Sequence, residues 1–257
     1  MHNNPFNKKN FLMPYFTFGD PTPEFTYDLI KAAFLNGADA VELGIPFSDP
    51  LADGPVIQSS HFRALTNNPE INLNDAFDLV KKIKNEFNKP IVFMAASNLI
   101  FHFGIEKFFK LAAKNGLNGI VIPDLSLEDS DAYYKLSQKY QIPLIYLASP
   151  FVSSKRIKKI VAKAEGFVYL ISSLGTTGER NSFAGTLQKV TEEIKKAKSI
   201  PVVVGFGISK KEHLDEIYKF ADGAIIGSYF VRILEENLNN LSMALNKIGS
   251  EIKLFTK

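Results

Sequence analysis

The segment 40–58 combines acidic side chains with a stiff backbone. Glu42 lies in a short apolar run, where a buried charge is costly unless it is paired or takes part in chemistry. Asp49 and Asp53 follow in a loop with three prolines, whose rings restrict the backbone and can hold a side chain in one place. We therefore expect Glu42 and Asp53 to form a two-carboxylate active site.

Each acid also has a structural interpretation, which the residues alone leave open. Glu42 could pair with a lysine or arginine inside the fold, since buried ion pairs do occur. Asp53 precedes Gly54-Pro55, which is a common turn sequence. Asp49 is better interpreted as a loop or interface residue. No histidine or further acid accompanies Asp49 and Asp53 to complete a metal site, so we expect no metal.

The composition suits one globular domain that spans residues 1–257. Hydrophobic residues make up 46% of the chain, and α/β barrels reach this length as a single domain. A formal net charge of +3 gives no ground for nucleic-acid binding, and no apolar run reaches the ~18 residues of a membrane span. The absence of cysteine excludes disulfides and thiolate chemistry. The polar N-terminus shows no signal-peptide pattern, so we expect a cytoplasmic protein.

Short apolar runs alternate with amphipathic runs along the whole chain. Continuous apolar runs are typical of strands buried on both faces, as in parallel sheets. The expected strands are 11–17, 40–43, 91–96, 119–123, 144–148, 167–172, 202–206 and 223–227. The expected helices are 24–36, 74–87, 104–115, 128–140, 153–164, 186–198, 209–220 and 229–247. This alternation favours an α/β fold, the (β/α)8 TIM barrel with eight parallel strands, although a doubly wound open sheet is the rival.

In such a barrel the active site lies at the carboxyl ends of the strands and in the loops that follow them. Glycines follow the sixth, seventh and eighth expected strands, within 175–178, 205–207 and at 227. Glycine lets backbone N–H groups approach a ligand closely, and helix N-termini attract anions. Because the loops after strands seven and eight commonly bind phosphate in these barrels, we expect a phosphate-bearing substrate.

The histidines and one tyrosine have packing interpretations. His61, His102 and His213 fall in helical or loop stretches, and we interpret them as surface or packing residues. Tyr169 lies in an apolar strand, where a tyrosine belongs to the core more often than to a ligand site.

The motif at 42–55, Glu-Leu-Gly-Ile-Pro-Phe-Ser-Asp-Pro-Leu-Ala-Asp-Gly-Pro, closely resembles the signature of the tryptophan synthase α subunit family. Other segments resemble the same family through most of the chain: Tyr-Phe-Thr-Phe-Gly-Asp-Pro at 15–21, Ile-Pro-Asp-Leu at 122–125, Gly-Thr-Thr-Gly at 175–178, Gly-Phe-Gly-Ile-Ser at 205–209 and Ala-Ile-Ile-Gly-Ser at 224–228. The resemblance implies a lyase that cleaves indole-3-glycerol phosphate, by a retro-aldol reaction, to indole and glyceraldehyde 3-phosphate.

The resemblance also implies roles for the matching residues. Glu42 matches the carboxyl group that gives and takes protons, and Asp53 matches the carboxylate beside the indole nitrogen. Thr177 matches a loop residue that helps to order this aspartate. Positions around the indole are matched by Tyr15 (where phenylalanine is common), Ile57, Val121, Tyr169 and Phe206. Positions at the phosphate are matched by Gly178, Gly207, Gly227 and Ser228.

The family further implies a β-subunit partner in an α2β2 tetramer, with pyridoxal phosphate in that partner and no cofactor in this chain. Two alternatives remain: a stand-alone lyase that releases free indole, and a catalytically weak barrel that mainly activates a β subunit. A Schiff-base aldolase is disfavoured because residues 167–172 contain no lysine. A dinucleotide enzyme is disfavoured because the segment 205–207 lacks the third glycine of the fingerprint.

Overall fold

A closed barrel of parallel strands forms the centre of the molecule. The computed structural model describes residues 4–50, 53–172, 180–205 and 207–257. Within these ranges the strands are β1 (Phe11–Thr17), β2 (Val41–Gly44), β3 (Ile91–Met94), β4 (Gly119–Val121), β5 (Leu144–Ala148), β6 (Val168–Ile171), β7 (Val202–Gly205) and β8 (Gly223–Ile226). Each strand pairs with the next, and β8 pairs with β1. The closure confirms the (β/α)8 barrel and excludes the open sheet.

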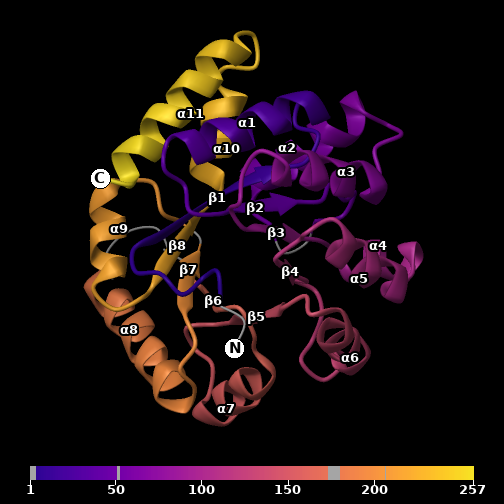
Figure 1. Cartoon of the computed structure of the whole chain (residues 1–257). Helices are drawn as coiled ribbons and strands as arrows, with labels where there is room; N and C mark the ends of the chain where they lie inside the picture. The colour runs from indigo at the N-terminus through magenta and orange to yellow at the C-terminus, as the bar shows by residue number, and fades with distance from the viewer. Residues whose placement is uncertain (1–3, 51–52, 173–179, 206) are drawn as a thin grey trace.

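Helices surround the barrel (Figure 1). In the described part of the chain they are α1 (Pro23–Leu35), α2 (Pro55–Asn67), α3 (Leu73–Lys84), α4 (Ser97–Phe103), α5 (Ile105–Lys114), α6 (Asp131–Tyr140), α7 (Ser154–Lys163), α8 (Arg180–Ala197), α9 (Lys211–Tyr218), α10 (Ser228–Glu235) and α11 (Leu241–Phe255). Among the helices described, none is both long and apolar enough to cross a membrane.

The helix pattern differs from the sequence expectation in three places. The structure adds α2 and α4, helices in the connections after β2 and β3, where the sequence pattern predicts none. The single helix expected at 229–247 is two helices, α10 and α11. The second begins where the Asn240 side chain accepts a hydrogen bond from the Met243 N–H at 3.1 Å, which is an N-cap that starts a new helix.

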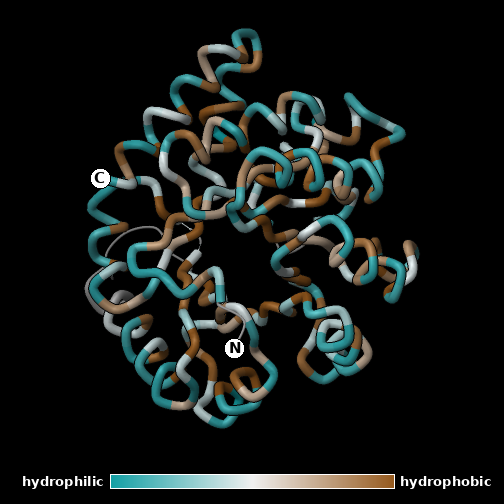
Figure 2. Tube along the Cα trace, in the orientation of Figure 1, coloured by the Kyte–Doolittle hydropathy of each residue, from teal (hydrophilic) through white to brown (hydrophobic). Residues whose placement is uncertain are grey.

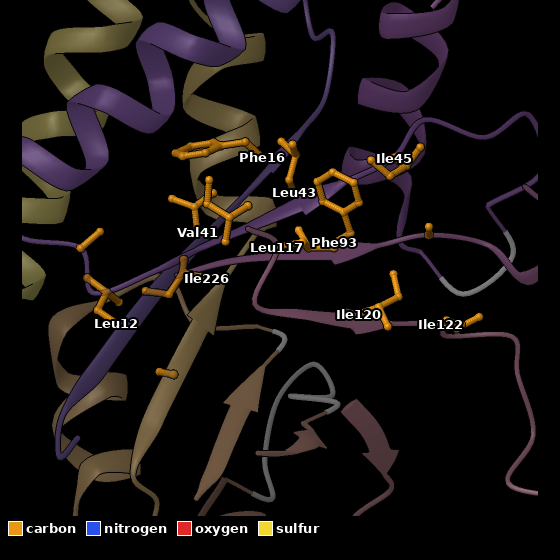
Figure 3. Packing of buried hydrophobic residues seen from close by; sticks show 14 of the residues in the cluster. Leu12, Phe16, Val41, Leu43, Ile45, Phe93, Leu117, Ile120, Ile122 and Ile226 are labelled. Carbon is orange, nitrogen blue, oxygen red and sulfur yellow. The ribbon is translucent and has the colours of Figure 1, made fainter. Parts of the chain in front are cut away.

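The strands are buried on both faces, as their continuous apolar runs predict. Along β1 all seven residues are buried. Alternate side chains enter two different apolar clusters, one inside the barrel and one between the strands and the helices. Figure 3 shows Phe16, Val41 and Leu43 of the outer cluster projecting from neighbouring strands toward the covering helices. The rigid strands can therefore present side chains at their carboxyl ends in fixed positions.

The opposite end of the barrel is closed by the N-terminal segment. The Phe6 ring is fully buried and packs edge-on against Phe11, at 5.9 Å between centroids, and Phe167, at 5.0 Å. The Asn4 side chain donates to the Gly166 carbonyl at 2.7 Å.

Figure 2 shows hydrophobic residues along the barrel strands and hydrophilic residues on the outer rim.

Candidate active site

Glu42 is buried in β2, directly opposite Tyr15 of β1 in the strand register. Only 1% of the residue is exposed, and neither carboxyl oxygen makes a hydrogen bond within the described part of the chain. Burial, followed by the charge of Asp53, raises the pKa of Glu42 from 4.5 to about 8. The carboxyl group therefore keeps its proton at neutral pH. A buried carboxyl group without a protein hydrogen-bond partner lowers the stability of the fold.

Asp53 lies between β2 and α2 and lines a cavity together with Glu42. Its backbone N–H donates to the Pro50 carbonyl at 3.1 Å, and the Gln58 side-chain amide donates to its carbonyl at 2.9 Å. Burial raises the pKa of Asp53 to about 6. At neutral pH the site therefore combines a protonated and an ionised carboxyl group. Acid–base catalysis by two carboxyl groups requires such a difference between their pKa values.

Two cavities share the wall formed by Tyr15, Asp53 and Met94. The smaller one, of about 40 Å³, contains both acids. The larger one, of about 270 Å³, extends from Asp53 toward the connections that follow β2, β3 and β4. The smaller cavity is lined by Tyr15, Glu42, Asp53, Ile57, Met94, Tyr169, Ile225, Gly227 and Ser228. Most of these residues come from strands, so the barrel itself sets their positions.

Two tyrosine rings fit against the cavity because strand glycines leave room for them. A Cβ atom on Gly44 would lie 2.0 Å from the Tyr15 hydroxyl oxygen, and one on Gly205 would lie 2.3 Å from a ring carbon of Tyr169. Both tyrosines are buried in the barrel-interior cluster. Tyr169 therefore packs in the core and also forms part of the cavity wall.

Three of the four expected phosphate residues, Gly207, Gly227 and Ser228, lie after the last two strands. Gly227 is the N-cap of α10 and Ser228 is its first residue, and both line the smaller cavity. The α10 N-terminus offers backbone N–H groups and the positive end of a helix dipole, which suit an anion. Gly207 is exposed in the loop after β7, with a φ of +73° that favours glycine.

The other expected residues have different outcomes. Ile57, on the first turns of α2, lines the smaller cavity. Val121 packs in the barrel-interior cluster, and the described walls of the two cavities do not include it. Thr177, Gly178 and Phe206 lie outside the residues that the structure describes.

His61 is 5% exposed, which agrees with a packing residue and excludes a surface one. Its polar contact was not expected from the sequence: Nε2 lies 3.1 Å from the Tyr15 hydroxyl oxygen. The same nitrogen is 3.9 Å from Asp53 Oδ2. The signal for this residue was Pro55, which favours the first position of a helix. Such a helix places His61 on the same face as Ile57, four residues earlier.

The described residues contain no group of three or more His, Asp or Glu side chains placed to hold a metal ion. The available chemistry is that of two carboxyl groups with different protonation, an apolar wall and a helix N-terminus. These features define the chain as a (β/α)8-barrel enzyme with a paired-carboxylate site at the carboxyl ends of its strands.

Sequence comparison then identifies the family. The sequence profile of the tryptophan synthase alpha chain matches residues 1–256. The chain therefore belongs to the tryptophan synthase alpha chain family, and it is a lyase of tryptophan biosynthesis.

Individual relatives agree with this assignment. The tryptophan synthase alpha chain of Alkaliphilus metalliredigens is 44% identical over 231 residues, which cover 90% of this chain and 86% of the relative. That of Methanocaldococcus jannaschii is 43% identical over 226 residues, covering 88% and 79%. A solved tryptophan synthase complex from Pyrococcus furiosus contains a chain with a TM-score of 0.84 and 35% identity, covering 95% of this chain and 98% of that one.

Proposed function

We propose that the chain cleaves indole-3-glycerol phosphate to indole and glyceraldehyde 3-phosphate. The observation that carries this proposal is the pair of unsatisfied, buried Glu42 oxygens beside the ionised Asp53. A retro-aldol cleavage at indole C3 needs one group that first donates a proton and then accepts one. A carboxyl group with a pKa of about 8 can do both near neutral pH.

The first step moves the Glu42 proton to indole C3, which leaves a carboxylate and a cationic indolenine ring. The carboxylate then removes the proton of the side-chain hydroxyl on the carbon attached to C3. As that hydroxyl becomes an aldehyde, the C–C bond breaks and its electron pair returns to the ring. The products are neutral indole and glyceraldehyde 3-phosphate, and Glu42 ends with its proton restored.

Asp53 supplies the charge that the intermediate needs. When C3 is protonated, positive charge develops on the ring nitrogen, and a fixed carboxylate that accepts the indole N–H stabilises it. The pKa of about 6 leaves Asp53 ionised at neutral pH. In this proposal the α10 N-terminus, with Gly227 and Ser228, binds the substrate phosphate, because its free backbone N–H groups suit an anion.

Cleavage assays on two carboxamide variants test this assignment. Glu42→Gln cannot donate or accept the transferred proton, so we expect kcat to fall by about 10²–10⁴-fold. Asp53→Asn loses the stabilising charge, so kcat should also fall, by roughly 10²-fold. Glu70→Gln, on an exposed residue that lines neither cavity, is the matched control. Undiminished cleavage by Glu42→Gln would remove the acid–base assignment.

We further propose a β-subunit partner in an α2β2 tetramer, with pyridoxal phosphate held by that partner. A solved Pyrococcus furiosus relative, 34% identical to this chain, is described as a tryptophan synthase α2β2 complex. Large apolar side chains are exposed in the connections after β2, β3 and β5, namely Phe62 (70%), Phe101 (63%) and Phe151 (79%). Exposed apolar residues at one end of a barrel suit a protein interface.

The two alternatives differ in how activity depends on this partner. Strong stimulation of cleavage by an added β subunit favours the α-subunit function, whereas full activity of the isolated chain favours a stand-alone lyase. A barrel that only activates the β subunit would show no cleavage in either condition. The low-dielectric environment of both acids favours a catalytic barrel over this last alternative.

A further inference from the structure

A hydrogen-bond chain joins α2 to β1 beside the two acids. His61 Nδ1 accepts from the backbone N–H of Phe47 at 3.1 Å, and His61 Nε2 lies 3.1 Å from the Tyr15 hydroxyl oxygen. Burial lowers the pKa of His61 to about 4, so the ring is neutral at neutral pH. Since Nδ1 is an acceptor, the ring proton is on Nε2, and His61 donates to Tyr15.

The hydrogen bonds that continue from Tyr15 to Thr17 and Ser60 all have the same donor-to-acceptor direction. Ser60 Oγ donates to the Ile57 carbonyl at 2.7 Å, so it accepts the proton of the Thr17 hydroxyl 2.5 Å away. Thr17 Oγ1 in turn accepts the Tyr15 hydroxyl at 3.3 Å. Each hydroxyl has a single proton, so the Ser60 bond sets the direction of all the others. The arrangement leaves Tyr15 as an acceptor toward His61.

The Asp53 carboxylate lies near the same donor. Asp53 Oδ2 is 3.9 Å from His61 Nε2, just beyond hydrogen-bond distance, and both residues line the larger cavity. Titratable groups face the two cavities from several elements: Tyr15 of β1, Glu42 of β2, Tyr169 of β6, and Asp49 and Asp124 in the connections after β2 and β4. His61 therefore brings a neutral N–H donor to 3.9 Å from the Asp53 carboxylate, in surroundings that otherwise contain acids and hydroxyls.

We propose that His61 is a positioning residue for Asp53, with its Nε2–H shared between the Tyr15 hydroxyl and the Asp53 carboxylate. The N–H turns toward one carboxylate oxygen when the other accepts the indole N–H. This inference rests on the proposed function, in which Asp53 stabilises the charged ring nitrogen. In this role the neutral His61 orients the Asp53 carboxylate and favours its ionised form.

A carboxyl carbon-13 NMR titration of Asp53, in the full chain without substrate, tests the inference directly. His61→Leu removes the donor, so the Asp53 pKa should rise by about one unit. His61→Gln keeps a donor at similar reach and should restore the wild-type value. Tyr15→Phe removes the competing acceptor, so the Asp53 pKa should fall instead. His102→Gln, on an exposed histidine, is the control and should leave the titration unchanged.

Kinetics give a second readout. Because Asp53 acts on charge that develops during the reaction, His61→Leu should lower kcat by about tenfold while KM changes by less than about twofold. The acid limb of the kcat/KM profile should move up in pH together with the Asp53 titration. His61→Gln should recover both values.

Three results would overturn the inference. They are an Asp53 titration that is the same in all variants, an equal loss in His61→Leu and His61→Gln, or a nitrogen-15 spectrum showing the wild-type ring proton on Nδ1. The spectrum needs no variant, so a folding defect cannot obscure it. If Glu42→Gln remains active, the proposed function fails, but the substrate-free titration still decides the role of His61.

Discussion

At the scale of single residues, Glu42 shows the cost of an active site inside a closed barrel. Its carboxyl group is buried in the barrel, and its pKa rises to about 8, first because the charged form loses hydration there and second because the charge of Asp53 lies nearby. An alanine or a methionine at this position would avoid the cost of burying an ionisable group. The fold therefore loses stability at this position as the pH rises toward 8, and the same raised pKa keeps the carboxyl group protonated near neutral pH, as the proposed acid–base role requires.

The pH dependence of stability should reveal this cost. Between pH 4.5 and 8 the unfolded Glu42 is ionised and the folded one carries a proton. Folding therefore takes up a proton, so the contribution of Glu42 to the free energy of unfolding falls as pH rises through this window. Glu42→Gln removes this term and should stabilise the chain by about 4 kcal/mol at pH 8. Urea unfolding at pH 5 and pH 8 measures it, and a stability difference between variant and wild type that does not change with pH would contradict it.

At the scale of elements, Arg63 ties together three segments around the cavity. Its guanidinium donates to both carboxylate oxygens of Asp20, which follows β1, at 3.0 and 2.8 Å. It also donates to Glu235, at the end of α10, at 2.7 Å. Asp20 is 1% exposed, so this bidentate pair satisfies a carboxylate that water does not reach. Helix α2, which carries His61, is therefore fixed relative to the helix that begins at Ser228.

Removing this arginine should be costly. Arg63→Leu leaves the Asp20 carboxylate buried and unpaired, so the free energy of unfolding should fall by about 3 kcal/mol. Arg156→Leu breaks an exposed pair with Glu128 and is the matched control, with little expected change. Chemical denaturation of both variants measures the difference. Equal losses in the two variants would show that Arg63 adds no more than a surface ion pair.

At the scale of the whole molecule, the two ends of the barrel differ. One end is closed by the Phe6 ring. The other end carries the two acids, the α10 N-terminus and the exposed Phe62, Phe101 and Phe151. The proposed substrate site and the proposed partner face therefore share the carboxyl end of the strands.

Single substitutions at the two ends of the barrel should differ in their effect on the affinity for a β subunit. Phe151→Ser removes an apolar side chain from the proposed partner face, so the dissociation constant for a β subunit should rise by about tenfold. Leu35→Ser removes an equally exposed apolar residue, 68% exposed, at the end of α1 that leads into β2. This control should leave the affinity unchanged. Calorimetric titration measures both values, and equal weakening would argue against a partner at the proposed face.

The barrel was largely predictable, because continuous apolar strands and amphipathic helices alternate with regular spacing. The two added helices were less so. Helix α4 spans only seven residues, and α2 begins in a segment dominated by proline and glycine. The break between α10 and α11 depended on a side-chain cap at Asn240, which a periodicity argument does not detect.

By itself, the sequence determined which residues could do chemistry and that a barrel would place them at one end. Glu42 in an apolar strand and Asp53 in a rigid loop were recognisable from residue type and spacing alone. Only the tertiary structure decided their protonation and the participation of His61. Those properties depend on desolvation and on hydrogen bonds between residues far apart in the chain, such as Tyr15 and His61. Packing creates both, and a linear pattern of residues does not contain them.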